Sequence, residues 1–314
     1  MTPMTAAPGA GSLAEQIDGW APAPVVRSDD LSRDRALALH GLLGPGAATA
    51  PQAIVPPLWT CVYFLEWTPL ADLGPDGHPA GGGFLPPLAD RRRVFAGGRT
   101  TFRAPLRFGQ AATATSTLAR TAVKNGRTGE LLLVTVRTEI TQDGHLAVTE
   151  EQDLIYRSGP APVAPGAGAA AAPAPAPDGG AARPGTPFEA GPVMLFAFSA
   201  LIANCHRIHY DLPYAQAREG YPGLLVHGPL LAVVMAEQVR AGSPGRPVRA
   251  LSYRFRQPLF AGERAAVTAA DGPAGAQLAV TGPDGTVRAS AVAELGPAGS
   301  ADRSPSPDPA GGHP

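Results

Sequence analysis

The sequence predicts an α+β protein made of two similar halves. Three observations support this prediction: β-rich segments separated by turn residues occur in each half, an apolar helical stretch directly precedes the strands of the second half, and a short segment of the first half recurs in the second. The chain has 314 residues, which is long enough for each half to bury a core of its own.

The first half begins with a predicted helix. Ser28-Asp29-Asp30 precede a leucine-rich stretch that ends at Gly44, a pattern typical of a capped helix. Asn125-Gly126 and Asp143-Gly144 are strong signals for hairpin turns. They separate three predicted strands, which should form an antiparallel meander over residues 113–123, 131–140 and 146–156.

The second half contains the longest apolar stretch. Residues 229–239 are apolar and begin with Pro229, which is preceded by Gly228. Because proline fits the first turn of a helix, we expect a buried helix here. Strands are expected to follow it over residues 249–256, 265–270, 277–281 and 286–294.

A short internal repeat links the two halves. Residues 102–109, Phe-Arg-Ala-Pro-Leu-Arg-Phe-Gly, recur as residues 255–262, Phe-Arg-Gln-Pro-Leu-Phe-Ala-Gly. Phenylalanine, arginine, proline, leucine and glycine are in register, and each copy lies where the meander of its half begins. The halves are therefore predicted to be two copies of one unit.

Composition divides the chain into segments. Residues 158–187 are mostly alanine, proline and glycine. Such a segment cannot bury enough apolar surface to offset its ordering entropy, so we predict a linker. It separates an N-terminal half, residues 25–157, from a C-terminal half, residues 188–295. We expect residues 1–24 to be disordered or weakly ordered and residues 296–314 to form a disordered tail.

Charge and cysteine content exclude several classes of function. The formal net charge is −1, so the chain has no excess of basic residues to bind nucleic acid or an anionic membrane. Cys61 and Cys205 are far apart and give no disulfide framework, which suits a reducing compartment. No apolar run is long enough for a membrane helix. We therefore expect a soluble cytoplasmic protein with no nucleic-acid or membrane partner.

Polar side chains are concentrated at residues 204–211. Two histidines, an asparagine and an aspartate lie there beside apolar sequence, and such groups are costly to bury without a purpose. Residues 219–228 then lead into the predicted helix, so the Gly228 N–H would lie at a helix N-terminus, where negative charge is stabilised. Dehydrating a 3-hydroxyacyl thioester needs a base, an acid and donors to the thioester oxygen, and these groups fit that need.

The run from Asn204 to Asp211 resembles the motif Asp-x-Asn-Pro-Leu-His-x-Asp of the MaoC-like and type 2 enoyl-CoA hydratase superfamily. His209 matches the catalytic histidine of that motif and Asp211 its final aspartate, and Val226-His227-Gly228 is similar to the segment that starts the family's helix. Asn204, His206 and Arg207 stand where the motif has Asp, Asn and Pro.

The altered motif looks closer to the subgroup of mesaconyl-CoA hydratases and hydroxyacyl-thioester dehydratases. Several segments of the first half are similar to the N-terminal hotdog of that subgroup, which resembles a fatty-acid-synthase dehydratase. These segments are residues 73–79, 82–87, 91–93, 96–99 and 150–156. The resemblance covers roughly residues 25–157 and 188–295.

The resemblance implies an α+β double hotdog fold, in which each half is an antiparallel sheet wrapped around a central helix. It implies a hydro-lyase that reversibly hydrates an enoyl thioester or dehydrates a 3-hydroxyacyl thioester. The substrate would be a thioester of CoA, or of acyl carrier protein, with a mesaconyl-like or other branched acyl group. No cofactor or metal ion is expected. Two hotdog units make a pseudo-dimer, and a homodimer of the whole chain is expected.

Each site residue has an expected role. His209 is the principal acid/base, and His206 is the second candidate for proton transfer. Asn204 would position water or the hydroxyl group, Asp211 would support the loop, and Gly228 would donate to the thioester oxygen. The residues expected to contact the substrate are Tyr221, Pro222, Gly223 and Arg207.

Two other functions stay open. A hotdog thioesterase typically needs a carboxylate on its central helix, whereas residues 229–236 contain none and Glu237 comes late in the helix. A protein that binds acyl thioesters without catalysis is favoured by the missing aspartate at Asn204.

Single residues also have alternative interpretations. His206 and His209 could be structural histidines bound to backbone carbonyl groups. A metal site of His206, His209 and Asp211 is less favoured, because their spacing does not place all three on one face of a helix or strand. The basic run at residues 91–93 could contact CoA phosphates or form a solvated surface.

Overall fold

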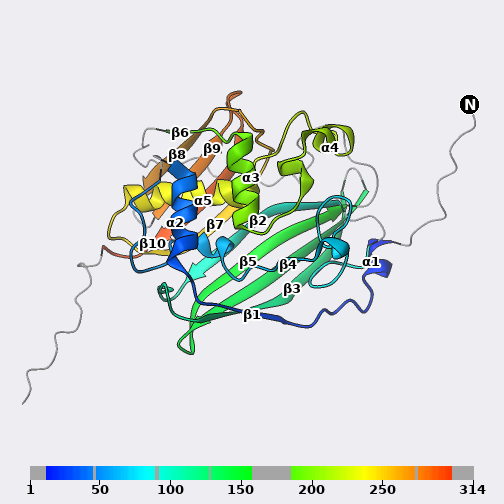
Figure 1. Ribbon diagram of the computed structural model, residues 1–314, viewed down its shortest axis with the longest axis horizontal. Coiled ribbons are helices and arrows are strands. Elements are labelled where there is room, and N and C mark those ends of the chain that lie inside the picture. Colours follow the sequence, from blue (N-terminus) through cyan, green and yellow to red (C-terminus); the bar gives the residue numbers. More distant parts are fainter. Residues whose placement is uncertain are drawn as a thin grey trace, which may run out of the picture.

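One antiparallel sheet dominates the protein (Figure 1). The computed structural model describes residues 12–44, 47–88, 92–126, 129–157, 185–272 and 275–298. Within these ranges the sheet has 10 strands in the order β1-β3-β4-β5-β2-β7-β10-β9-β8-β6. The strands are β1 (Val25–Asp29), β2 (Arg92–Phe102), β3 (Ala112–Gly126), β4 (Gly129–Gln142), β5 (His145–Arg157), β6 (Thr186–Phe188), β7 (Val248–Phe255), β8 (Ala265–Gly272), β9 (Gly275–Thr281) and β10 (Val287–Leu295).

The strand order confirms the predicted duplication. Read from its outer edge, the first half runs β1-β3-β4-β5-β2 and the second runs β6-β8-β9-β10-β7. The halves join where β2 pairs antiparallel with β7, from Gly97 opposite Arg254 to Thr101 opposite Ala250. The repeated segments occupy equivalent places, because β2 ends at Phe102 and β7 ends at the matching Phe255.

Both predicted meanders are present. At the turn between β4 and β5, Asp143 and Gly144 both have positive φ values, of 51° and 75°. This is the backbone that a two-residue hairpin requires, and Gln142 pairs with His145 on either side of it. The other strands of the meanders are longer than expected, whereas β7 and β10 have the expected length and are shifted by one residue; β2 was not predicted.

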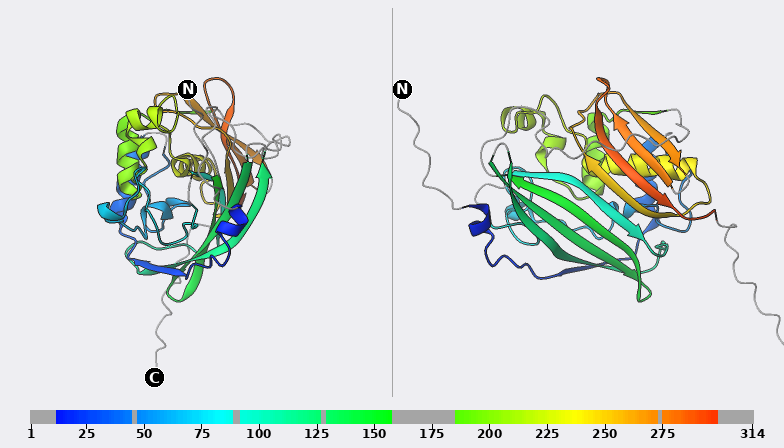
Figure 2. Two further views of the ribbon diagram at one scale, coloured as in Figure 1. Left: turned by 90° about the vertical axis from the view of Figure 1, so that its right-hand side faces the viewer. Right: turned by 180° about the vertical axis from the view of Figure 1, so that it is seen from behind.

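The helices lie on one side of the sheet (Figure 2). They are α1 (Leu13–Gln16), α2 (Arg33–Leu43), α3 (Pro192–Leu201), α4 (Leu212–Ala217) and α5 (Gly228–Gly242), with 3₁₀ turns η2 (Trp59–Val62), η3 (Leu70–Asp72) and η4 (Arg207–His209). The predicted buried helix is α5, which packs against β7, β8, β9 and β10. Pro229 lies in its first turn, and most of its side chains are buried.

The two halves differ in what fills the inner face of the sheet. In the second half, α5 lies centrally across the strands. In the first half, α2 is shorter, buries only Ala36 and Leu39, and packs against α3 and η2. One apolar core runs through both halves and includes Trp59, Ile140 and Met235.

Three boundaries differ from those expected. Ser28 and Asp29 belong to β1, which pairs with β3. Helix α2 is instead capped by Ser32, whose hydroxyl oxygen accepts from the Asp34 N–H. Gly44 ends the helix as predicted. Residues 13–16 form a capped helix with a buried Leu13, so order begins within the stretch expected to be weakly ordered.

The predicted linker, residues 158–187, ends earlier than expected. Thr186–Phe188 form β6, which pairs with β8 and so belongs to the sheet. The rest of the linker up to residue 184 lies outside the described residues, as does the tail from residue 299. Among the helices of the described ranges, none is long and apolar enough to cross a membrane.

Candidate active site

The loop from Asn204 to Asp211 connects α3 to α4 and contains η4. Its start is shaped by Asn204, whose Oδ1 accepts a hydrogen bond from the His206 N–H at 2.9 Å. Its end is fixed by Asp211, which caps α4 by accepting from the Tyr214 N–H at 3.1 Å. Arg207 binds the other carboxylate oxygen of Asp211, with its Nε at 2.9 Å and Nη2 at 2.7 Å. Asp211 and Arg207 therefore hold the loop.

His209 is buried and neutral. Its Nδ1 lies 2.9 Å from the Leu225 carbonyl oxygen. Because a carbonyl can only accept, Nδ1 carries the hydrogen and Nε2 keeps a lone pair. Burial lowers the pKa of His209 to about 4, even though the bond to Leu225 favours the charged form. The ring can therefore accept a proton at Nε2 near neutral pH.

His209 stacks on His227, the residue that caps α5, with ring centroids 3.6 Å apart. The Nε2 of His227 lies 2.8 Å from the Ser199 hydroxyl, and burial holds the pKa of His227 well below its usual value. Gly228 is the first residue of α5, and first-turn N–H groups have no acceptor within their own helix. The positive end of the α5 dipole therefore lies beside His209.

Gly228 is also sterically required. A Cβ at this position would lie 2.9 Å from the ring of Phe255. Phe255 is the repeated phenylalanine at the end of β7, so the internal repeat contributes directly to the shape of the site.

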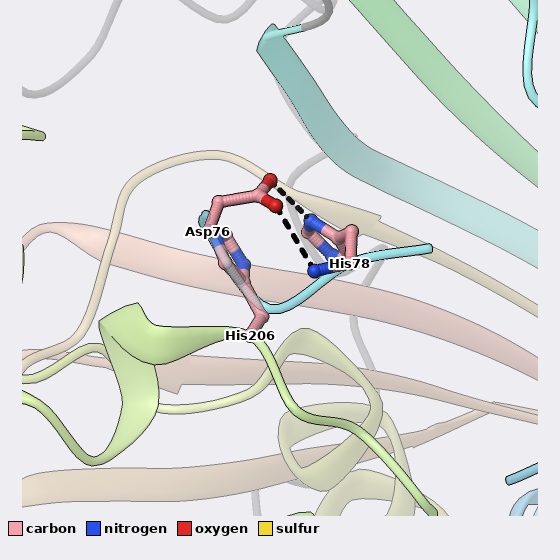
Figure 3. A group of neighbouring side chains, drawn as sticks. All are labelled: Asp76, His78 and His206. Atoms are coloured by element: carbon pink, nitrogen blue, oxygen red, sulfur yellow. Dashed lines mark hydrogen bonds and ion pairs between the residues drawn. The ribbon is translucent and has the colours of Figure 1, made fainter. Parts of the chain in front are cut away.

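The structure adds two residues from the first half (Figure 3). The Nδ1 of His78 lies 2.8 Å from Asp76 Oδ2, and the His78 N–H donates to Asp76 Oδ1 at 3.0 Å. The ring of His78 contacts that of His206, with centroids 4.0 Å apart. Asp76 and His78 therefore meet the predicted histidine cluster across the boundary between the halves.

Several contacts hold the loop of Asp76 against the second half. The Arg207 N–H donates to the Asp76 carbonyl at 2.9 Å, and Arg207 Nη1 donates to the Pro75 carbonyl at 2.9 Å. Gly77, which follows Asp76, has a φ of 87° and packs so tightly against the Cys205 carbonyl that a Cβ would collide with it. Glycine is the residue that fits both constraints.

Four histidines thus form a row, His78, His206, His209 and His227. The His206 and His209 rings are perpendicular, with centroids 5.6 Å apart. Burial lowers the pKa of every one of them, that of His206 to about 2. For Asp76, burial alone would raise the pKa, but the hydrogen bonds from His78 outweigh it and hold the pKa well below its usual value.

A cleft of about 220 Å³ opens beside this row. His78 and Asn204 both line it, together with Arg93 of β2. The other residues that line it are Glu66, Thr68, Leu73, Gly77, Pro79, Ala203 and Cys205. Since both halves contribute, the cleft exists only in the assembled double unit.

The chain matches the family described as hydroxyacyl-thioester dehydratase type 2 over residues 58–261. Mesaconyl-C(4)-CoA hydratase of Chloroflexus aurantiacus is 43% identical over 284 residues, which cover 85% of this chain and 94% of that protein. This chain belongs to the type 2 hydroxyacyl-thioester dehydratase family. The mitochondrial hydroxyacyl-thioester dehydratase type 2 of Schizosaccharomyces pombe is 37% identical over 75 residues, 23% of this chain and 25% of that protein.

Solved structures show the same fold. HtdX of Mycobacterium tuberculosis superposes with a TM-score of 0.62 at 18% identity, over 86% of this chain and 99% of that chain. A second M. tuberculosis protein, described as having a double hotdog fold, gives 0.57 at 13% identity over 89% and 97%. At such identities the likeness concerns the fold alone. The α+β double hotdog fold is thereby confirmed, and family membership confirms the hydro-lyase class of enzyme.

For this dehydratase family member, the sequence had not assigned a role to Asp76, His78 or His227. The first two lie in the segment of residues 73–79 that resembles the subgroup, and His227 lies in the segment that starts the helix. The resemblance could therefore have pointed to these residues. Their spacing along the chain, however, does not show that they lie beside the histidine cluster.

The residues expected to contact the substrate lie outside the lining of the cleft or are already bonded to other residues. Tyr221, Pro222 and Gly223 form the turn between α4 and α5, with the Tyr221 ring 6.3 Å from that of Phe260. None of the three is among the residues that line the cleft of about 220 Å³, and neither are His206, His209 and Gly228. The cleft therefore lies beside the His78 end of the histidine row. The guanidinium of Arg207 is already occupied by Asp211 and the Pro75 carbonyl.

The structure groups a different set of possible metal ligands from His206, His209 and Asp211. The carboxylate of Asp211 pairs with Arg207 and caps α4, so it does not join His206 and His209. Among the described residues, Asp76, His78 and His206 are grouped closely enough, with ligand atoms within 4.8 Å of one another.

Proposed function

We propose that this protein interconverts an enoyl-CoA and the corresponding 3-hydroxyacyl-CoA at the histidine row between its halves, next to the cleft that His78 and Asn204 line. The observation that carries the proposal is the placement of His209, a buried neutral histidine with a lone pair on Nε2, beside the N-terminus of α5. A base next to hydrogen-bond donors is the arrangement needed to form an enolate from a thioester.

In the dehydration direction, His209 Nε2 takes the proton from the α-carbon. Negative charge then develops on the thioester oxygen, where the N–H of Gly228 and the α5 dipole stabilise it. The double bond forms as the C–O bond at the β-carbon breaks, and the hydroxyl group leaves as water after accepting one proton. Hydration follows the same steps in reverse.

The remaining residues support this chemistry. We assign Asn204, which lines the cleft, to positioning the water or hydroxyl group through its amide. Arg207 and Asp211 are assigned to holding the loop, which replaces the substrate contact expected for Arg207. Tyr221, Pro222 and Gly223 stay proposed substrate contacts, at the turn that leads into α5.

For the acyl group we propose a small branched chain that carries a free carboxylate, as in mesaconyl-CoA. The similarity to mesaconyl-C(4)-CoA hydratase supports this choice, as does the cation Arg93, which lines the cleft and has the chemistry to bind a carboxylate.

The position of Glu237 argues against hydrolysis. This carboxylate is 2% exposed and accepts from the Trp59 indole at 3.1 Å and from the Ala48 N–H at 3.0 Å. Arg240 pairs with both of its oxygens, at 3.0 and 2.9 Å. With its acceptors used in this way, the only carboxylate of α5 is not placed to activate water for a thioesterase.

The proposal is tested with the purified full chain and crotonyl-CoA, mesaconyl-CoA and branched enoyl-CoAs. Loss of absorbance from the conjugated thioester shows hydration. Release of free thiol would show a thioesterase, and no change with any substrate would support a binding protein without activity. His209→Ala should lower turnover about 100-fold or more, while circular dichroism stays unchanged. His145→Ala, at an exposed histidine of β5, is the matched control.

We also propose a homodimer in the cytoplasm, as the sequence suggests. Hotdog units associate through their sheets, and within the described residues no helix lies on the face of this sheet away from α5 (Figure 2). Light scattering of the purified chain distinguishes a monomer from a dimer.

A further inference from the structure

Only one of the four histidines bonds directly to a carboxylate. His209 bonds to the Leu225 carbonyl and His227 contacts the Ser199 hydroxyl, whereas His78 bonds to Asp76. A carboxylate stabilises an imidazolium much more than a neutral oxygen does. Within this row, His78 is therefore the histidine best able to carry a positive charge.

The position of His78 fits the β-hydroxyl group of the substrate, which His209 does not contact in the proposed reaction. In the proposed reaction the thioester oxygen is bound at the start of α5, which would place the α-carbon near His209. The β-carbon and its hydroxyl group would then extend away from α5. His78 lies on that side, beyond His206, and lines the cleft together with Asn204.

We infer that His78, oriented by Asp76, is the second catalytic histidine and acts on the β-hydroxyl group. This inference rests on the proposed function and adds the residue that donates a proton to the departing hydroxyl group. In dehydration, protonated His78 gives its Nε2 proton to the departing hydroxyl, forming water. His209 keeps the α-proton, so one proton is donated and one is accepted. In hydration, neutral His78 takes a proton from water as the oxygen bonds to the β-carbon.

Asp76 is a positioning residue in this scheme. It takes the place of the carboxylate that the family motif carries where this chain has Asn204, but it acts through His78 and comes from the other half. Between turnovers His209 loses its proton to water and His78 regains one, so the catalytic cycle closes. The first half therefore supplies a reacting group and does more than shape the cleft.

A metal ion at the same residues is the competing interpretation. Both oxygens of Asp76 already accept hydrogen bonds from His78, one from the ring and one from the backbone. The ring bond requires a hydrogen on Nδ1, so a metal ion could be bound only by Nε2 of His78, and Asp76 would have to share or give up oxygens that are used in these hydrogen bonds. The geometry thus favours a hydrogen-bonded pair.

The charges around His78 determine how a variant should behave. Burial has the largest effect and lowers the pKa of His78. The hydrogen bond that His78 donates to Asp76 raises it, Arg93 lowers it, and Glu219 raises it. The neighbouring His206 ring is neutral. Loss of the Asp76 charge should therefore lower the pKa of His78.

The test uses His78→Gln and Asp76→Asn in the full chain, assayed for dehydration of the 3-hydroxyacyl-CoA made from the best enoyl-CoA. His78→Gln should lower kcat about 100-fold or more with KM within about threefold. Asp76→Asn should lower kcat about tenfold. It should also move the alkaline limb of the pH profile to lower pH, because dehydration needs His78 protonated. His145→Gln is the control.

Each outcome decides between the interpretations. A His78→Gln enzyme within about threefold of wild type, or an unmoved alkaline limb in Asp76→Asn, would overturn the inference and leave the proposed function standing. One metal ion per chain in the purified active protein, lost in His78→Gln, would overturn it in favour of a metal site. A wild-type chain inactive on every thioester would overturn both. If His78→Gln fails to fold, the pH profile of Asp76→Asn still decides.

Discussion

Asn204→Asp is the most informative single substitution, because it restores the family carboxylate with almost no change in shape. The Oδ1 of Asn204 accepts from the His206 N–H at 2.9 Å, and an aspartate oxygen can accept the same bond. The loop geometry should therefore be kept. What changes is the charge in the cleft that His78 and Arg93 also line.

The expected effect is a loss of activity. An opposite charge within about 4–6 Å raises the pKa of a histidine by about 1–3 units, or about 1.4 kcal/mol per unit. Because the loop is only half-buried, we take the lower part of that range. The new charge would favour protonated His78, which dehydration needs, but it also repels the developing enolate, and we expect this repulsion to dominate. Turnover should fall about 10- to 100-fold.

Progress curves for wild type and Asn204→Asp, with circular dichroism to confirm folding, measure this effect. Asn204→Ala is the matched control, since it removes the hydrogen bond to His206 without adding charge. A similar loss in both variants would show that geometry, and not charge, is responsible. A rise in activity with Asn204→Asp would refute the reasoning, because it would identify Asn204 as a site that had lost its acid and leave no such role for His78.

Three further predictions concern other parts of the site. Arg93→Ala should raise KM about 10-fold or more for mesaconyl-CoA but leave that for crotonyl-CoA, which has no free carboxylate, within about twofold; equal effects would contradict carboxylate binding. Gly228→Ala should destabilise the fold by about 1–3 kcal/mol in urea unfolding and lower kcat, because its Cβ would press on Phe255; Gly191→Ala, with open space at its Cβ, should do neither. Glu237→Leu should lower the free energy of unfolding by about 3 kcal/mol, because it leaves buried hydrogen-bond donors unpaired. Adding Arg240→Met should recover part of that loss. An unchanged thermal midpoint for Glu237→Leu would contradict this account.

The sequence by itself determined the local structure and the class of chemistry. Turn pairs such as Asp143-Gly144 have strong backbone preferences of their own, so the meanders could be predicted without knowing their neighbours. The apolar run after Pro229 could only be a buried helix, and α5 is one. The cluster from Asn204 to Asp211 is contiguous, and its polar residues indicated a site.

Other elements depended on pairing partners that local preference does not specify. Ser28-Asp29 have capping residue types, yet they form β1 because β3 offers hydrogen bonds to that edge. Thr186–Phe188 form β6 within an otherwise linker-like composition because β8 is the partner. In both cases a long-range ladder outweighs local composition.

The complete site was decided only by the tertiary structure. Asp76 and His78 are far from His206 in the sequence, and nothing in their spacing predicts that the rings lie 4.0 Å apart. That contact requires β2 to pair with β7, Gly77 to pack on Cys205, and Arg207 to bind the Pro75 carbonyl. The pKa values follow from the same packing, because burial is a property of the assembled halves and not of any one segment.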